Sequence, residues 1–267
     1  MSGVTRPGNA ELRDLAVQVA TAAAQLVAEA RREGVSVAAT KSSAIDVVTD
    51  ADRASEALVR RMLHAARPHD AVWGEEEGRG SGDSGVEWVV DPIDGTVNYL
   101  YGRAEYAVSV AARVGGESVA AAVVDVPRST VYAAARGEGA TRDGARLQVR
   151  PVPPFAERLV LTGFGYDAEV RASQAATVAR LLPRIRDIRR LGSCALDLCH
   201  LAEGLADGYV EEGPAPWDHA AGSLVLTEAS GRFALLPGVG GRDVVVAAPA
   251  DGFDEFTEVL ASCGFFR

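Results

Sequence analysis

The sequence predicts an α/β protein, and three observations support this fold class. The chain has 267 residues, 48% of them hydrophobic and 24% charged, a globular composition long enough to bury a core without disulfides. Between residues 86 and 135, short apolar runs alternate with glycine turns, which is typical of an antiparallel meander. After residue 154, strand and helix patterns alternate, as they do in layered α/β proteins.

Two helices are expected before the first long strand. Apolar residues at spacings of three and four predict an opening helix that is capped by Asn9 and ends at Gly34. Thr49 and Asp52 form a T-x-x-D capping box for a second helix, which must end by Pro68. Taken alone, Asp52 is a first-turn carboxylate that favourable interaction with the helix dipole would explain.

The remaining strands and helices fall into two groups on either side of a proline-rich segment at residues 151–154. The expected strands of the first group are 87–90, 106–114, 118–126 and 130–135. Those of the second group are 159–162, 187–191, 208–211, 232–236 and 244–248, with helices over 168–182, from Ser193 and after Trp217. We therefore expect an N-terminal α+β part, residues 1–150, and a C-terminal α/β part, residues 151–267.

Charge and cysteine content narrow the class of protein. The 37 acidic and 27 basic residues give a net charge of −10, which repels a nucleic-acid backbone, so we expect no nucleic-acid binding. Three cysteines without C-x-x-C spacing fit a reducing compartment. The chain shows neither a signal-peptide pattern nor a long uncharged apolar run, so we expect a cytoplasmic protein that does not contact a membrane.

Three acidic fragments stand out because each places carboxylates beside turn residues at the end of an apolar strand. They are Trp73–Glu77, Trp88–Thr96 and Pro216–Gly222. Oxygen ligands of this kind suit Mg²⁺, which binds through a few carboxylates, waters and substrate phosphate. The fragments together predict a magnesium site.

The central fragment has the most informative spacing. The proline after Asp91 keeps that residue extended and Gly95 permits a tight turn, so the side chains of Asp91 and Asp94 can face one ion or two, with the Ile93 carbonyl between them. The amides of Gly95 and Thr96 would suit phosphate oxygens. D-P-x-D-G by itself is also common turn chemistry.

In combination, these fragments resemble the motifs of the inositol monophosphatase family, part of the superfamily of lithium-sensitive, magnesium-dependent phosphatases. The resemblance covers nearly the whole chain, including Arg190–Ser193 and Glu211, and departs from the family pattern at Ala104 and Cys194. The motifs that carry it, in chain order, are D-x-V-T-x-x-D at Asp46–Asp52, G-E-E at Gly74–Glu76, D-P-I-D-G-T at Asp91–Thr96 and W-D-x-A-x-G at Trp217–Gly222.

The resemblance implies a sugar-phosphatase fold of alternating helix and sheet layers, a homodimer, and hydrolysis of myo-inositol 1-phosphate or a similar small polyol phosphate by metal-activated water. It implies two or three Mg²⁺ ions, held by Glu75, Asp91, the Ile93 carbonyl, Asp94 and Asp218. Asp52 and Thr96 would activate the water, and Glu76 would support the site from outside the ligand set. The residues implied to contact substrate are Asp94, Gly95, Thr96, Gly192, Ser193, Cys194 and Glu211.

Three alternatives remain open from the sequence. Relatives with the same metal motifs hydrolyse histidinol phosphate or fructose 1,6-bisphosphate, so the alcohol part of the substrate is not fixed. A regulatory protein that binds transcription machinery could retain the same fold. Cys194 could be a reactive thiol at a helix start, although small-residue core packing also explains it.

Overall fold

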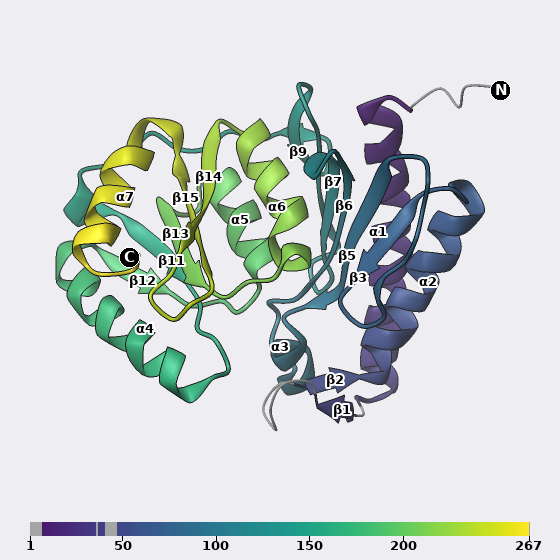
Figure 1. The fold of residues 1–267 in the computed structure, drawn as a ribbon, viewed down its shortest axis with the longest axis horizontal. Coiled ribbons are helices and arrows are strands. Elements are labelled where there is room, and N and C mark those ends of the chain that lie inside the picture. Colours follow the sequence, from purple (N-terminus) through teal and green to yellow (C-terminus); the bar gives the residue numbers. More distant parts are fainter. Residues whose placement is uncertain (1–6, 36, 41–46, 267) are drawn as a thin grey trace.

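Five layers of helices and sheets make up the described part of the chain, residues 7–35, 37–40 and 47–266 of a computed structural model (Figure 1). The α-helices are α1 (Asn9–Glu33), α2 (Asp50–Ala66), α3 (Thr96–Tyr101), α4 (Ala168–Leu181), α5 (Cys194–Ala202), α6 (Pro216–Glu228) and α7 (Phe253–Ser262). Short 3₁₀ turns cover Phe155–Glu157, Leu182–Arg184 and Ala250–Gly252.

The first large sheet has eight strands in the order β10-β9-β8-β7-β6-β5-β3-β4. All neighbouring pairs are antiparallel except β3 and β5, which run parallel. This confirms the predicted antiparallel meander. Its strands are β3 (Ala71–Gly74), β4 (Gly78–Arg79), β5 (Val86–Asp94), β6 (Ala107–Val114), β7 (Glu117–Asp125), β8 (Thr130–Ala135), β9 (Gly139–Arg142) and β10 (Ala145–Arg146).

The second sheet has five strands in the order β12-β11-β13-β15-β14. Strand β11 runs parallel to both of its neighbours, and β15 runs antiparallel to both of its own. The strands are β11 (Leu159–Thr162), β12 (Asp187–Arg189), β13 (Gly208–Glu212), β14 (Gly231–Pro237) and β15 (Asp243–Pro249). A separate antiparallel pair, β1 (Val37–Thr40) and β2 (Val47–Thr49), precedes α2.

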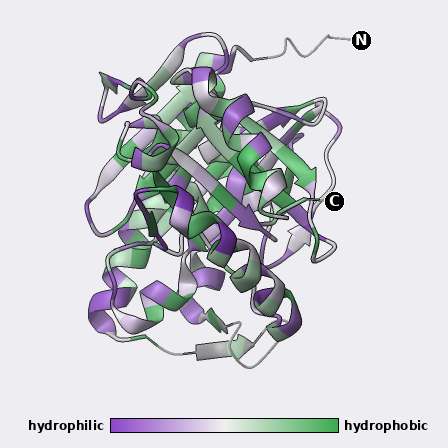
Figure 2. Ribbon diagram, turned by 90° about the vertical axis from the view of Figure 1, so that its left-hand side faces the viewer, coloured by the Kyte–Doolittle hydropathy of each residue, from purple (hydrophilic) through white to green (hydrophobic). Residues whose placement is uncertain are grey.

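Three hydrophobic cores separate the five layers. One core packs α1 and α2 against the outer face of the eight-stranded sheet, and another packs α4 and α7 against the outer face of the five-stranded sheet. The central core surrounds α5 and α6 between the two sheets and takes residues from both predicted parts of the chain. Figure 2 shows the hydrophobic stretches of the strands gathered inside the molecule. The predicted layered α/β class is confirmed, whereas the boundary at residue 150 stays a prediction.

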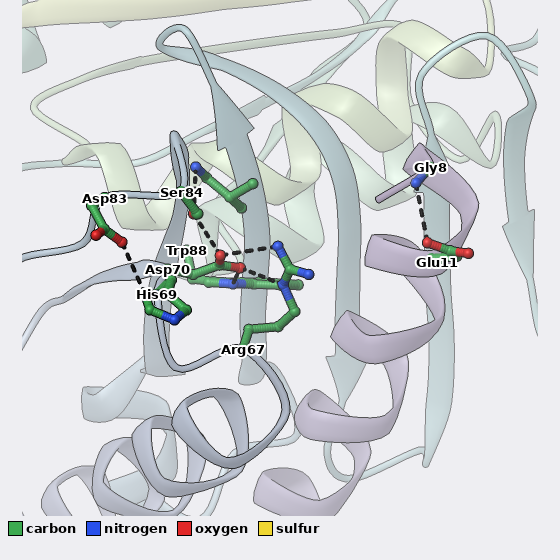
Figure 3. A network of polar contacts seen from close by, with 9 residues as sticks. Gly8, Glu11, Arg67, His69, Asp70, Asp83, Ser84 and Trp88 are labelled. Carbon is green, nitrogen blue, oxygen red and sulfur yellow. Dashed lines mark hydrogen bonds and ion pairs between the residues drawn. The ribbon is translucent and has the colours of Figure 1, made fainter. Parts of the chain in front are cut away.

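The predicted cap of the first helix is wrong by one residue. Asn9 is the first helical residue and Gly8 occupies the cap position. The Gly8 amide donates to Glu11 Oε2 at 3.2 Å (Figure 3), while the Asn9 side chain donates to the Arg136 carbonyl instead. The Asn9 side chain, which was predicted to cap α1, therefore connects α1 to the loop after β8 instead.

A buried polar network fixes the beginnings of β3 and β5. Asp70 directly precedes β3, and its Oδ2 accepts hydrogen bonds from Trp88 Nε1 and Arg67 Nε, both at 2.9 Å. Ser84 Oγ donates to Asp70 Oδ1 at 2.6 Å (Figure 3). These contacts fix the beginnings of the two parallel strands relative to each other. The acidic residues of the sequence motifs lie at or just after the C-terminal ends of the same strands.

Candidate metal centre and active site

Strand β5 ends in a bulge that carries two aspartates. Asp91 pairs with Ser109 and Asp94 with Ala107, so three steps along β5 correspond to two along β6. The Ile93 amide donates to Asp91 Oδ1 at 3.0 Å, which stabilises the bulge. Because a bulge redirects side chains, two residues of one strand can contribute to one site.

A third aspartate comes from the first turn of α6. This helix begins at Pro216, earlier than predicted, because proline suits the first helical position. Asp218 Oδ2 accepts from the Ala215 amide at 2.6 Å, which fixes the carboxylate at the helix start. One oxygen from each of Asp91, Asp94 and Asp218 lies within 4.8 Å of the others.

Electrostatics show that these carboxylates lack compensating charge. Burial raises the pKa of Asp91 well above its usual value, and the neighbouring Glu75, Asp94 and Asp218 raise it further. Burial also raises the pKa of Asp94 to about 7, outweighing the hydrogen bonds from Ser193 and Ala195 that lower it. An all-oxygen donor set with excess negative charge fits a hard divalent cation such as Mg²⁺.

Glu75 lies beside this group, at the first position after β3. The parallel pairing of Gly74 with Val90 places the turn next to Asp91, and the Glu75 amide donates to the Val90 carbonyl at 3.2 Å. Glu75 is outside the set of three aspartates, but its charge raises the pKa values of both Asp91 and Asp218. The structure therefore brings four of the predicted carboxylates into one electrostatic cluster.

Asp52 both caps α2 and contacts the central motif. The carboxylate is fully buried, and its Oδ2 accepts from the amide and the hydroxyl of Thr49 at 2.8 and 2.5 Å. Thr96 Oγ1 lies 3.1 Å from Asp52 Oδ1 and 3.0 Å from the Ile93 carbonyl, and its single proton serves one acceptor at a time. The predicted capping box is confirmed, and the same carboxylate reaches Thr96.

The turn between β5 and α3 requires glycine. Gly95 has φ +98°, and a Cβ there would lie 2.7 Å from the Glu105 carbonyl and 3.2 Å from that of Gly192. Thr96 directly follows as the first residue of α3. The tight turn thus places the Thr96 hydroxyl beside Asp52 without obstructing the segment around Gly192.

The loop before α5 lies against the same motif. Ser193 caps α5, and its hydroxyl donates to Asp94 Oδ2 at 2.7 Å, as does the Ala195 amide. The Asn98 side chain donates to the Leu191 carbonyl at 2.8 Å and to the Glu105 carbonyl at 2.7 Å. Leu191 and Gly192 therefore leave the sheet, and β12 ends at Arg189, two residues before its predicted end.

Cys194 is a core residue rather than an activated thiol. Its side chain is 6% exposed, and burial raises the pKa of the thiol well above its usual value. The nearby carboxylates of Asp94, Glu211 and Asp218 raise it further. Because thiol reactivity requires the thiolate, the core-packing interpretation of Cys194 is the better one.

Glu211 lies one residue from the end of β13 and faces the end of β11. Tyr209 Oη donates to Glu211 Oε2 at 2.8 Å. Burial raises the pKa of Glu211, although the Tyr209 hydrogen bond and the positive charge of Arg190 lower it. A Cβ at Gly163 would lie 1.9 Å from Glu211 Oε2, so glycine at the end of β11 makes room for this carboxylate.

Four polar residues that surround these groups were not predicted from the sequence. Ser109 and Asp197 are polar positions inside otherwise apolar runs, which is the signal that could have identified them. Asn98 follows the central motif by two residues, and Glu56 lies one helical turn after Asp52. The first motif's Asp46 lies outside the described residues.

Glu76 contributes a backbone contact. Its amide donates to Glu56 Oε2 at 2.8 Å. The predicted supporting role of the Glu76 side chain stays a prediction.

Among the described helices, none is long and apolar enough to cross a membrane.

Comparison with known proteins agrees with this arrangement. Residues 9–254 match the model of the inositol monophosphatase family. The chain is 44% identical over 286 aligned positions to the inositol-1-monophosphatase SuhB of Mycobacterium tuberculosis, covering 99% of this chain and 98% of that protein. It is 34% identical to the Nus factor SuhB of Escherichia coli, covering 92% of this chain and 97% of that protein.

The fold has a close counterpart among solved structures. The structure of Mycobacterium tuberculosis SuhB superimposes with a TM-score of 0.85 at 41% sequence identity, covering 98% of this chain and 100% of that one. The family match extends over nearly all of the chain and includes both sheets and helix α6, which carries Asp218. The chain therefore belongs to the inositol monophosphatase family, a family of phosphatases.

Proposed function

We propose that the protein is a Mg²⁺-dependent phosphomonoesterase that converts myo-inositol 1-phosphate or a similar small polyol phosphate to the alcohol and inorganic phosphate. The observation that carries this proposal is the convergence of Asp91, Asp94 and Asp218 beside the hydrogen-bonded pair of Asp52 and Thr96. The three aspartates suit a cation and the pair suits a water, which are the two requirements of this hydrolysis.

The donor set indicates which residues would hold the cation. Asp91, Asp94 and Asp218 would bind Mg²⁺, together with Glu75 and the Ile93 carbonyl. Four carboxylates carry a charge of −4, and a phosphate monoester adds about −1.5 to −2 near neutral pH, so two divalent ions leave the site undercompensated and a third nearly balances it. When bound, Mg²⁺ supplies positive charge for the phosphoryl oxygens and lowers the pKa of water.

Thr96 and Asp52 would orient the attacking water and accept its proton. When the Thr96 hydroxyl donates to Asp52 Oδ1, a lone pair on Thr96 Oγ1 remains free to accept a proton from water. The water proton passes to Thr96 Oγ1 as the Thr96 proton passes to Asp52. Both hydrogen bonds from Thr49 hold the Asp52 carboxylate in place during this exchange.

The leaving alcohol would be recognised on the α5 side of the cluster. Asp94 is held there by Ser193 and by the α5 backbone, and Glu211 contributes a second carboxylate. Carboxylates accept hydrogen bonds from the hydroxyls of a polyol but repel phosphate. Glu211 and the loop Gly192–Cys194 therefore suit the alcohol, while Gly95 and Thr96 suit the phosphate.

Phosphate release tests this proposal. The purified protein would be assayed with inositol 1-phosphate, histidinol phosphate, fructose 1,6-bisphosphate and a simple aryl phosphate, with Mg²⁺ and with excess chelator. We expect the highest kcat/KM for a polyol monophosphate, loss of turnover with chelator and loss in Asp91→Asn. Undiminished turnover in chelator would refute the metal requirement, and a preference for another ester would replace the substrate assignment.

The Escherichia coli relative gives a second candidate, because its name as a Nus factor connects that protein with transcription. A binding role of this kind would need the surface of the fold but not the carboxylate cluster. Complementation of a deletion strain with Asp94→Asn separates the two functions. Full complementation by a protein that releases no phosphate would favour the binding role.

The oligomeric state is a separate part of the proposal. We propose a homodimer on the strength of the family resemblance. Light scattering of the purified protein measures its mass directly, and a monomeric mass across the working concentration range would contradict the dimer.

A further inference from the structure

Glu56 accepts two successive backbone amides of the turn that carries Glu75. Glu56 comes from α2, and its side chain is fully buried. Its Oε2 accepts from the Glu76 amide at 2.8 Å, and its Oε1 accepts from the Glu77 amide at 3.1 Å. The turn thus receives from a side chain the acceptors that a regular strand or helix would provide.

Gly74 makes this contact possible. A Cβ at residue 74 would lie 2.2 Å from Glu56 Oε1 and 2.5 Å from Oε2. The glycine is therefore required by the close approach of the carboxylate, because its φ is not in the left-handed region. The G-E-E motif and Glu56 form one packed unit, although they are separated by a helix and a strand.

Arg60 completes the unit on its other side. Arg60 Nε donates to Glu56 Oε1 at 2.8 Å, one helical turn along α2. The same guanidinium donates to the Gly78 carbonyl at 2.6 Å and to the Val72 carbonyl at 3.3 Å. A buried carboxylate is tolerated when it is paired and fully hydrogen-bonded, and these contacts meet that condition.

One face of α2 contacts two acidic segments, the turn after β3 and the end of β5. Asp52, Ser55 and Glu56 are spaced at i, i+3 and i+4, which places them on the same face of a helix. Asp52 accepts from Thr96, and Ser55 Oγ donates to the Pro92 carbonyl at 3.2 Å. Glu56 is the third residue of this face that forms such a contact, and it binds the turn after β3.

We propose that Glu56 is a positioning residue for the cation site, because it fixes the backbone on one side of Glu75. The β3–β5 pairing fixes the other side through the Glu75 amide, which donates to the Val90 carbonyl. This inference rests on the proposed function, in which Glu75 is a metal ligand. Partners that orient metal ligands typically contribute about 10- to 100-fold in metal affinity.

A direct metal titration tests the role of Glu56. Mn²⁺ serves as the probe, with free Mn²⁺ measured by electron paramagnetic resonance in the absence of substrate. We expect Glu56→Gln to weaken Mn²⁺ binding about 10-fold or more, because the two backbone amides contact different carboxylate oxygens and the NH2 group that replaces one of them cannot accept a hydrogen bond. The concentration of Mg²⁺ for half-maximal activity should rise to the same degree, with little change of kcat at saturating Mg²⁺.

Glu77→Gln is the matched control. The Glu77 side chain is 59% exposed and lies 3.3 Å from Arg60, so this variant changes the same residue type next to the same arginine. It should bind Mn²⁺ with wild-type affinity. Hydrogen exchange of the peptide covering residues 74–78 should accelerate in Glu56→Gln and not in Glu77→Gln. This measurement shows how well the backbone amides of the turn are protected, independently of the metal.

Unchanged Mn²⁺ affinity in a folded Glu56→Gln protein would overturn the proposal. If that variant does not fold, Glu56→Asp is decisive, because it keeps the charge but shortens the side chain by one methylene and so withdraws the carboxylate from the two backbone amides. Wild-type affinity in a folded Glu56→Asp protein would then overturn the proposal, and weaker binding would support it. A wild-type protein that binds Mn²⁺ but releases no phosphate would refute the proposed function and leave the role of Glu56 intact, whereas absence of Mn²⁺ binding would overturn both.

Discussion

The Ser193 hydroxyl donates a hydrogen bond to Asp94 Oδ2 at 2.7 Å, which connects the start of α5 with the end of β5. The same hydroxyl oxygen accepts from the Leu196 amide at 3.3 Å and so caps α5. One side chain therefore serves both the helix and the acidic cluster. This arrangement explains how α5 and the end of β5 contribute to a single site.

Ser193→Ala should lower the stability of the protein by about 1 kcal/mol, the usual effect of losing a helix cap. It should also weaken cation binding, because the lost hydrogen bond stabilises the charged form of Asp94. Thermal unfolding with and without Mg²⁺ measures both effects. Ser223→Ala is the control, since among the described residues the Ser223 hydroxyl donates to the Ala220 carbonyl within the same helix, α6. Equal shifts in the two variants would contradict a special role of Ser193.

Asp52→Asn and Thr96→Ala should each reduce kcat on the order of 10²-fold or more, the effect expected on losing a positioned general base. KM should change little, because neither side chain is assigned to the alcohol. Thr96→Ser keeps the hydroxyl and should retain most of the activity. Full activity of Asp52→Asn, measured by steady-state kinetics, would reduce Asp52 to a capping residue of α2.

Mg²⁺ should raise the melting temperature of the wild-type protein at neutral pH. Asp91, Asp94 and Asp218 have raised pKa values because they are buried next to one another, and a bound cation offsets this repulsion. Calorimetry in Mg²⁺ and in chelator measures the difference. Asp218→Asn removes one of the three carboxylates and should reduce the shift. The same shift in this variant would place the stabilising ion elsewhere.

Asp197→Asn should make the free energy of unfolding less dependent on pH. Both Asp197 carboxylate oxygens are buried without a hydrogen-bond partner among the described residues, and burial raises the pKa well above its usual value. The native state therefore binds more protons than the unfolded state, so stability falls as pH rises above the unfolded pKa of about 3.9. An asparagine side chain does not titrate, so Asp197→Asn should lack the part of this pH-dependent fall in stability that comes from residue 197.

Urea unfolding at about pH 5 and about pH 8, in chelator, measures this linkage. The difference in unfolding free energy between Asp197→Asn and the wild type should shift in favour of the variant at the higher pH. A difference that is the same at both pH values would show that Asp197 does not titrate between them.

Glu211→Gln should weaken turnover of inositol 1-phosphate by about 1–3 kcal/mol in kcat/KM, the range for a hydrogen bond with a charged group. Cation affinity should be unchanged. An aryl phosphate without hydroxyls should be hydrolysed at nearly the wild-type rate, because Glu211 is assigned to the polyol. Equal losses for both esters would show that Glu211 supports the cation site or the fold.

Local patterns in the sequence were enough to predict the secondary structure of the central elements and the types of residue in the candidate site. The apolar strands around residues 106–135 and the capping box of Thr49 and Asp52 depend on local patterns, and the structure confirms both. Short motifs of carboxylate, proline and glycine also depend on neighbouring residues. Because these motifs resemble those of a known family, candidate ligands could be named before the fold was known.

The contacts that hold these groups together become visible in the folded structure alone. Ser193 meets Asp94, and Glu56 meets the turn after Gly74, through contacts between residues far apart in the chain. Local patterns cannot encode such distances, because they depend on how layers pack and which strands pair. The same packing buries Asp197 and raises its pKa, which an isolated position in a helix pattern does not reveal.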